Sequence, residues 1–401
     1  MSVDLDWRYR RDTFDQPPAG SPKGRRRRWR KWVTLLAAVV VLVALGAFSY
    51  WRARRAWLEQ TAADVRAVAQ LEMRALADGD VELYLSLQDG ADAVWLEAQR
   101  AHWLSGCPLL PPAPGFTVTL PATIELPIVI GDRARVEVVR LAGPPGEEPH
   151  PFRSVAFYRQ VADGRWVHTA PDPDYGGRVL VWVGPRNDLA GYIVQTELLA
   201  QLAMELETTT ATFCGLFPCP DGLRFTLAFT DTLGEQRAAI AVLPAPHLAG
   251  VPDNEGARAI WVQAIKGHLA NLMLDEVVGR LVGGFIEASL RHRVKEYLRA
   301  GPSHQLDPVL LAQAVAEGRL LGLVALWEQA VADDQTALAE DEAALLVRFV
   351  EQAYGPEGVA SLLAQIGTAS SLEALLRDAL GADLASFEKR WLDYVHQEVA
   401  P

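Results

Sequence analysis

The apolar residues of the chain form one long uninterrupted stretch and many shorter periodic segments. Residues 32–51, WVTLLAAVVVLVALGAFSYW, contain no charged side chain, and a helix of this length crosses roughly 30 Å of hydrocarbon. Apolar residues then recur at helical spacing over 56–76, with Gly79 just past the end of the pattern. Two shorter helices are predicted over 80–88 and 91–104. The pattern therefore predicts that the chain begins with helices.

Alternating segments follow a proline-rich break at 108–115. Apolar and polar residues alternate in four runs, which is the pattern of strands with one buried face. Gly, Pro and Asp turns separate the runs, which cover 117–126, 133–141, 154–161 and 165–170. Helices followed by an antiparallel sheet indicate an α+β fold.

The second half is predicted to contain a small β part and many helices. A helix is expected from about 189 to 213, followed by apolar strands at 223–230 and 238–246, and the chain is almost wholly helical from 256. Gly355-Pro356 is predicted to end one helix and begin the next. Ser370 and Glu373 have the spacing of a capping box before the helix LEALLRDAL.

Composition and charge predict how the chain is oriented in a membrane. A chain of 401 residues that is 50% hydrophobic is too long for one ordinary domain, and its net charge of −12 argues against nucleic acid as the main partner. Residues 1–31 hold ten basic and four acidic side chains, directly before the apolar stretch. This asymmetry predicts an uncleaved anchor with a cytoplasmic N-terminus and an extracytoplasmic body. A cleaved signal peptide is the alternative, although its candidate site at 47–49 lies inside the apolar run.

The cysteines are consistent with an extracytoplasmic body. Cys214 and Cys219, in the segment CGLFPC, are close enough in sequence to form a disulfide in an oxidising compartment, which would leave Cys107 over. Two independent buried cysteines are the alternative. A zinc pair is disfavoured because further Cys or His ligands do not stand close in sequence.

Residues 52–175, which end in FYRQVADGRWVHTAPDPD, resemble the NTF2-like family in the order and length of their elements. The resemblance implies a conical pocket between helices and sheet, which some members use for small molecules or catalysis and many only for protein contacts. The side chains to inspect in such a pocket are Tyr84, Trp95, His102, Trp103 and His168. They include no acid/base pair at a diagnostic spacing.

Residues 339–395 carry a second resemblance. The helix running up to Tyr354-Gly355, the short helices after it and the final Glu388-Lys389-Arg390-Trp391 are similar to the C-terminal part of peptidase MA-like proteins, gluzincins related to thermolysin. The resemblance covers roughly residues 185–398. In that family two histidines in HExxH share a zinc ion, the Glu between them is the general base, and a Glu from the next helix is the third ligand.

This motif is degenerate here. Leucines stand where the general base and the second histidine should be, and Ala288 replaces the Gly that usually follows the third ligand. The degenerate motif positions are His268, Leu269, Leu272 and Glu287. One imidazole and one carboxylate do not make a catalytic zinc site, which needs three protein ligands and an open position. We therefore predict a pseudo-peptidase without catalytic residues, metal or other cofactor.

An active hydrolase is the alternative, with either a rearranged zinc site or the NTF2-like pocket as its active site. Asp275 lies seven residues after His268 on the same helical face, next to Glu276, and either carboxylate would have to complete the site. Charged residues along a helix more often form a solvated face. His292 and Glu296, spaced i, i+4, are predicted to make a surface contact.

By analogy with the fold, the predicted function is a membrane-anchored binding or scaffolding module for a peptide or cell-envelope protein. The predicted groove contains His268, Asn271, Asp275, Glu276 and Glu287. The predicted divisions are a basic cytoplasmic tail (1–31), a transmembrane helix (32–51), an NTF2-like α+β domain (52–175) and a degenerate peptidase MA-like domain (176–401).

Overall fold

The computed structural model describes residues 23–104, 106, 109–231, 240–279, 284–299, 306–329 and 331–399. The chain divides into two compact units between Thr61 and Ala62. The division falls within helix α1 (Lys23–Asp78), and the NTF2-like boundary predicted near residue 175 lies inside the second unit and stays a prediction. Cys107 and the tail up to residue 22 lie outside the described residues.

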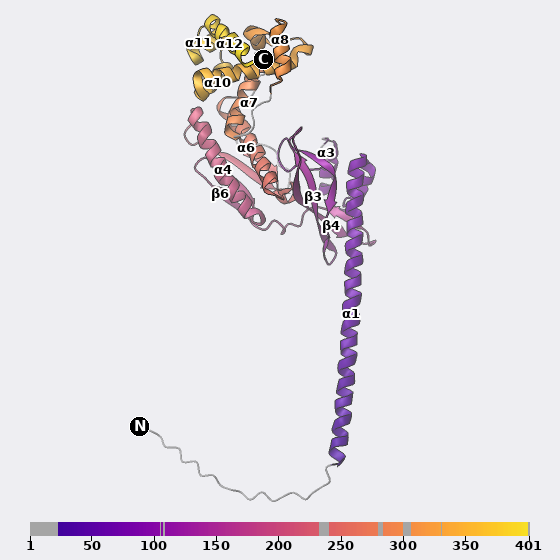
Figure 1. Cartoon of the computed structure of the whole chain (residues 1–401). Helices are drawn as coiled ribbons and strands as arrows, with labels where there is room; N and C mark the ends of the chain where they lie inside the picture. Colours follow the sequence, from indigo (N-terminus) through magenta and orange to yellow (C-terminus); the bar gives the residue numbers. More distant parts are fainter. Residues whose placement is uncertain are drawn as a thin grey trace, which may run out of the picture. The chain divides into compact units, whose positions relative to one another are not determined.

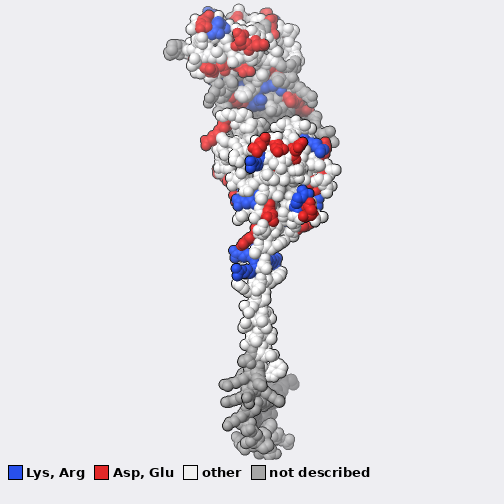
Figure 2. All heavy atoms as spheres, turned by 90° about the vertical axis from the view of Figure 1, so that its right-hand side faces the viewer, with Lys and Arg blue, Asp and Glu red and all other residues white. Residues whose placement is uncertain are grey.

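In the first unit, α1 contains the apolar stretch (Figure 1). The helix is long and apolar enough to cross a membrane, as predicted, and the large apolar side chains of its residues 35–51 are exposed. Figure 2 shows a band of uncharged side chains along this helix, followed by a cluster of basic side chains. In the sequence, Arg52, Arg54 and Arg55 directly follow the apolar stretch. The helix expected over 56–76 is present as the last part of α1, which continues to Asp78 because neither Gly nor Pro interrupts residues 47–78.

The second unit begins with the end of α1 packed on an antiparallel sheet. Its strands are β1 (Thr117–Ile124), β2 (Ile128–Ile130), β3 (Arg133–Gly143), β4 (His150–Gln160), β5 (Trp166–Thr169) and the short β10 (Val251–Pro252), in the path β1-β3-β4-β10 with β2 on β3 and β5 on β4. Val136 of β3 and Tyr158 of β4 are buried with Val65 and Ala69 of α1. Helices α2 (Val81–Ser86) and α3 (Ala93–Leu104) precede the sheet. The predicted α+β class is confirmed.

A second, mixed sheet follows. It has the order β6 (Val179–Val183), β7 (Asn187–Tyr192), β8 (Phe225–Thr230) and β9 (Ile240–Pro244), with β6 antiparallel to β7 and the other pairs parallel. The helix predicted from about 189 was wrong at its start, since α4 begins only after the 3-10 turn Ile193–Gln195 and spans Thr196–Leu216. Residues 187–192 alternate between more and less buried positions and pair with two neighbouring strands, so they form a strand. Cys214 and Cys219 form a disulfide at the end of α4.

The rest of the chain is mostly helical, as predicted. It contains α5 (Pro246–Ala249), α6 (Glu255–Val277), α7 (Phe285–Arg299), α8 (Pro308–Ala316), α9 (Gly322–Glu328), the 3-10 turn Asp333–Gln335, α10 (Thr336–Ile366), α11 (Leu372–Leu380) and α12 (Leu384–Val399). Gly355 breaks α10 with φ 74° and ψ 177°, as the Gly-Pro pair predicted. The predicted capping box was wrong by one residue, because Ser371 caps α11 by accepting a hydrogen bond from Ala374 N.

The first sheet and the helical part share a core. Phe116 and Phe152 from the first sheet region lie in the same buried cluster as Trp261 of α6. The indole of Trp261 also donates a 2.9 Å hydrogen bond to Pro112 O. Buried Arg140 of β3 donates a 2.8 Å hydrogen bond to Ala249 O. These contacts and the β4–β10 pairing explain why residues 62–401 form one unit.

Candidate functional site

Helix α6 determines where the degenerate motif lies. Asn254 caps it by accepting a hydrogen bond from Ala257 N, and Trp261, Ile265, Leu269 and Met273 then follow at intervals of four residues on its buried face. Leu269 is 0% exposed. A leucine therefore fills the core at the position that the predicted motif assigns to a general base.

The other predicted groove residues of α6 lie outside this apolar face. Asn271, Asp275 and Glu276 are exposed, and Leu272 is partly buried against the core. His268 is half-buried, and its Nε2 is buried without a hydrogen-bond partner in the described part of the chain. Burial lowers the pKa of His268, so its imidazole is neutral near pH 7.

Arg291 of α7 brings Glu287 and Asp275 together. Its Nε donates to Glu287 Oε1 at 3.0 Å, and a second nitrogen donates to Asp275 Oδ1 at 3.0 Å. A third donor reaches Gly279 O. Only 9% of the Arg291 side chain and 6% of the Glu287 side chain are exposed. The guanidinium, which does not lose its proton in proteins, thus supplies the positive charge that a metal ion would otherwise bring to Glu287.

This ion pair has a sequence signal that the sequence analysis overlooked. Glu287 and Arg291 are four residues apart, the spacing at which side chains on a helix interact. Asp275 lies 16 residues before Arg291 on another helix, so its participation depends on how α6 packs against α7. In the described ranges, no group of three or more His, Cys, Asp and Glu side chains has a geometry that could hold a metal ion.

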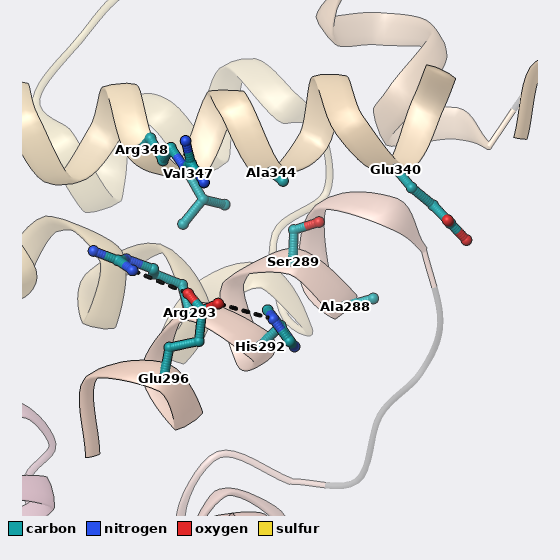
Figure 3. A pocket seen from close by; sticks show the side chains of 9 residues that line it. All are labelled: Ala288, Ser289, His292, Arg293, Glu296, Glu340, Ala344, Val347 and Arg348. Carbon is teal, nitrogen blue, oxygen red and sulfur yellow. Dashed lines mark hydrogen bonds and ion pairs between the residues drawn. The ribbon is translucent and has the colours of Figure 1, made fainter. Parts of the chain in front are cut away.

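A cleft of about 240 Å³ lies between α7 and α10 (Figure 3). Small side chains of both helices leave this space, and charged side chains border it. Figure 3 shows Glu340 toward one end of the α10 segment and Arg348 toward the other. The lining consists of Ala288, Ser289, His292, Arg293, Glu296, Glu340, Ala344, Val347 and Arg348. Acidic and basic side chains thus surround a small apolar surface formed by Ala288, Ala344 and Val347.

Ion pairs hold the α7 side of this cleft, which we call the α7–α10 cleft. His292 Nε2 lies 3.1 Å from Glu296 Oε1, so the predicted contact is present, but Glu296 is buried and not on the surface as predicted. Arg293 bonds Glu296 at 3.0 Å and Glu351 of α10 at 2.6 Å. The Arg293–Glu351 pair thus connects the two helices beside the cleft.

A second cleft, of about 170 Å³, contains one predicted groove residue. Its lining is Gly284, Ile286, Glu287, Leu326, Trp327, Ile366 and Gly367. His268 and Asn271 line neither of these two clefts. The structure thus brings Glu287 to a concave surface but leaves the other predicted groove residues off both.

The residues inspected for the NTF2-like pocket form two aromatic contacts. Tyr84 and Trp103 have ring centroids 5.2 Å apart, and Trp95 and His168 have centroids 5.1 Å apart. His102 is partly buried, which lowers its pKa. The sequence analysis missed Glu72, which lies 2.7 Å from His168 Nδ1, because 96 residues separate the two in the chain.

The described residues form an α+β fold, and one helix among them is long and apolar enough to span a membrane. No protein-family model matches the chain. No curated protein matches it either. Among solved structures, an M1 zinc metallopeptidase from Deinococcus radiodurans, a mutant bound to a Tyr-Ser-Ala substrate, is similar with TM-score 0.27 and 12% identity over 71% of this chain and 61% of that one. The match spans less than two thirds of that enzyme, and a likeness this weak carries no argument about activity.

Proposed function

We propose that the chain is a single-pass membrane protein and that its peptidase-like part, residues 176–401, is a non-catalytic binding module on the extracytoplasmic side. The apolar part of α1 and the basic residues before it support the anchor and its orientation. The observation that carries the non-catalytic role is the bonding of Arg291 to both Glu287 and Asp275. A metal ion at Glu287 would have to displace a buried guanidinium.

The alternative, an active hydrolase with a rearranged zinc site, needs His268, Glu287 and Asp275 or Glu276 to converge. Two of these carboxylates already bond Arg291. Leu269 lies in the core where the general base would act. A catalytic zinc site also requires an open coordination position for water. These contacts favour binding over catalysis.

The α7–α10 cleft is the site that we assign to the bound partner. Its volume of about 240 Å³ lies below the roughly 300–1,000 Å³ of small-molecule pockets, which suits a side chain or two of a longer segment. Glu340 and Arg348 border it with opposite charges. A peptide segment of a cell-envelope protein, with a basic side chain near Glu340 and an acidic one near Arg348, matches this pattern.

Cross-linking in cells tests the site. A photo-reactive amino acid at position 288 or 344 of the full chain should give a defined protein adduct. The same group at exposed Lys389 should give none. Exchanging the charges, with Glu340→Arg and Arg348→Glu, should abolish the adduct. An adduct that forms equally from position 389, or that survives the charge exchange, would refute the assignment.

Metal content tests the non-catalytic role separately. The purified full chain, dialysed against trace zinc, should retain no stoichiometric zinc by mass spectrometry. Zinc bound one to one and lost in His268→Ala would instead support the hydrolase. Arg291→Met is the informative companion variant, because it leaves Glu287 and Asp275 without the guanidinium that they share.

A further inference from the structure

A buried carboxylate lies under the first sheet, at the end of α1. The Glu72 side chain is 2% exposed and accepts three hydrogen bonds. The donors are Gln88 Nε2 at 3.1 Å, Tyr158 OH at 2.9 Å and His168 Nδ1 at 2.7 Å. None of these four side chains takes part in the α7–α10 cleft or in the degenerate motif.

Glu72 is ionised in this position. Burial by itself would raise its pKa, but the adjacent His168 and the three hydrogen bonds outweigh burial and lower the pKa below its ordinary value of 4.5. An ionised carboxylate only accepts hydrogen bonds. The proton of the Glu72–His168 bond therefore resides on Nδ1 of the imidazole.

This proton placement determines the chemistry of the other ring nitrogen. A neutral imidazole with its proton on Nδ1 has a lone pair on Nε2. Nε2 has no hydrogen-bond partner among the described residues, and it is not among the buried polar atoms that lack one. Since 17% of the His168 side chain is exposed, the lone pair faces solvent.

Aromatic rings hold the imidazole in place. His168 stacks on Tyr158 with centroids 5.2 Å apart and an interplanar angle of 26°. Trp95 meets it edge-on at 5.1 Å, and the indole N–H of Trp95 donates to Gln88 at 3.2 Å. The Gln88 amide in turn bonds Glu72, so the carboxylate, the imidazole and both rings form one connected network.

We propose that Glu72 and His168 form a hydrolytic dyad, in which His168 Nε2 is the general base and neutral esters are the substrate class. The ionised Glu72 disfavours anionic substrates, and the partly exposed Trp95 ring favours an apolar acyl group. The dyad does not depend on the proposed binding function, since it shares no residue with the α7–α10 cleft.

The proposed step balances without a co-reactant other than water. His168 Nε2 takes a proton as the water oxygen bonds to the ester carbonyl carbon. The bond from that carbon to the alkoxy oxygen then breaks, and Nε2–H returns the proton to the leaving oxygen. Glu72 keeps Nδ1–H oriented and stabilises the transient imidazolium. It is a positioning residue.

Two variants of the full chain in detergent micelles test this chemistry, with p-nitrophenyl acetate as the probe. His168→Gln should lower the rate of nitrophenolate release about a hundredfold, the lower range for a general base. Glu72→Gln should lower it to the same level, because the amide N–H donates to Nδ1 and forces the proton onto Nε2. His396→Gln, at an exposed histidine of α12, should keep the wild-type rate.

The tautomer can be measured without any variant, which keeps the proposal testable if a variant fails to fold. Long-range ¹H–¹⁵N NMR of wild type should show His168 protonated on Nδ1, and Glu72→Gln should show it protonated on Nε2. Wild-type His168 protonated on Nε2, or an unchanged rate in His168→Gln, would overturn the dyad. Neither result depends on whether cross-linking at the α7–α10 cleft succeeds.

Discussion

Glu342 of α10 is an unusual carboxyl group whose behaviour can be calculated from its surroundings. Its side chain is 0% exposed, and both carboxyl oxygens accept from Leu321 N, at 3.0 and 3.2 Å, where α9 begins. Burial raises its pKa to about 7, although the N–H groups of Leu321 and Gly322 act in the opposite direction. The described residues contribute no cation within ion-pair distance.

The sign of the effect follows from proton binding. Between about pH 4.5 and pH 7 the folded protein keeps the Glu342 proton and the unfolded chain has lost it. Stability from this group is therefore complete below pH 4.5 and is lost as the pH rises through 7. The difference between 4.5 and about 7, at 1.36 kcal/mol per pKa unit, corresponds to about 3 kcal/mol.

Glu342→Gln removes the charge but keeps an oxygen that accepts from Leu321 N. We expect this variant and wild type to have similar free energies of unfolding at pH 4.5. At pH 8 the variant should be more stable by up to about 3 kcal/mol. Urea unfolding of the full chain in micelles, followed by tryptophan fluorescence, measures both values.

Glu340→Gln is the matched control, because Glu340 is exposed on the same helix. Its effect on stability should be small and should not change with pH. The difference between Glu342→Gln and wild type isolates Glu342 from other titrating groups. If that difference is the same at pH 4.5 and pH 8, the reasoning about Glu342 is wrong.

Three further predictions concern other parts of the chain. Arg291→Met leaves Glu287 buried without its partner and should cost about 3–5 kcal/mol of unfolding free energy in urea, with recovery when Glu287→Gln is added; no recovery would mean that lost packing is the cause. Replacing Cys214 and Cys219 by Ser opens a short loop and should lower the free energy of unfolding by about 2 kcal/mol relative to oxidised wild type. Reduced wild type should match the variant. Val41→Arg places a charge in the apolar span, which should make membrane insertion less favourable by about 3 kcal/mol and increase extraction by carbonate. Unchanged extraction would argue against a membrane anchor.

Much of the secondary structure could be predicted because its causes are local. The apolar span, the alternating strands of the first sheet and the break at Gly355 each follow from residues close together in sequence. The error at residues 187–192 arose because pairing with neighbouring strands determines their structure. They form a strand between β6 and β8. The apolar span and the helix expected over 56–76 form one continuous helix because neither Gly nor Pro separates them.

The candidate sites were harder to predict. Leu269 and Leu272 at the predicted motif positions are visible in the sequence, and so is the spacing of Glu287 and Arg291. The role of Asp275 is not visible, since its contact with Arg291 requires α6 and α7 to pack side by side. His268 and Asn271 were expected in a groove, but they line neither of the two clefts described.

The sequence by itself determined the helix able to span a membrane and the α+β class, because each depends on residue type and short-range spacing. Only the tertiary structure decided which charges meet. Glu72 and His168 lie 96 residues apart and join because one face of α1 packs on the sheet that contains β5. The α7–α10 cleft exists because small side chains of two distant helices face each other. Such contacts depend on packing and solvent exclusion, which the order of residues encodes only through the whole fold.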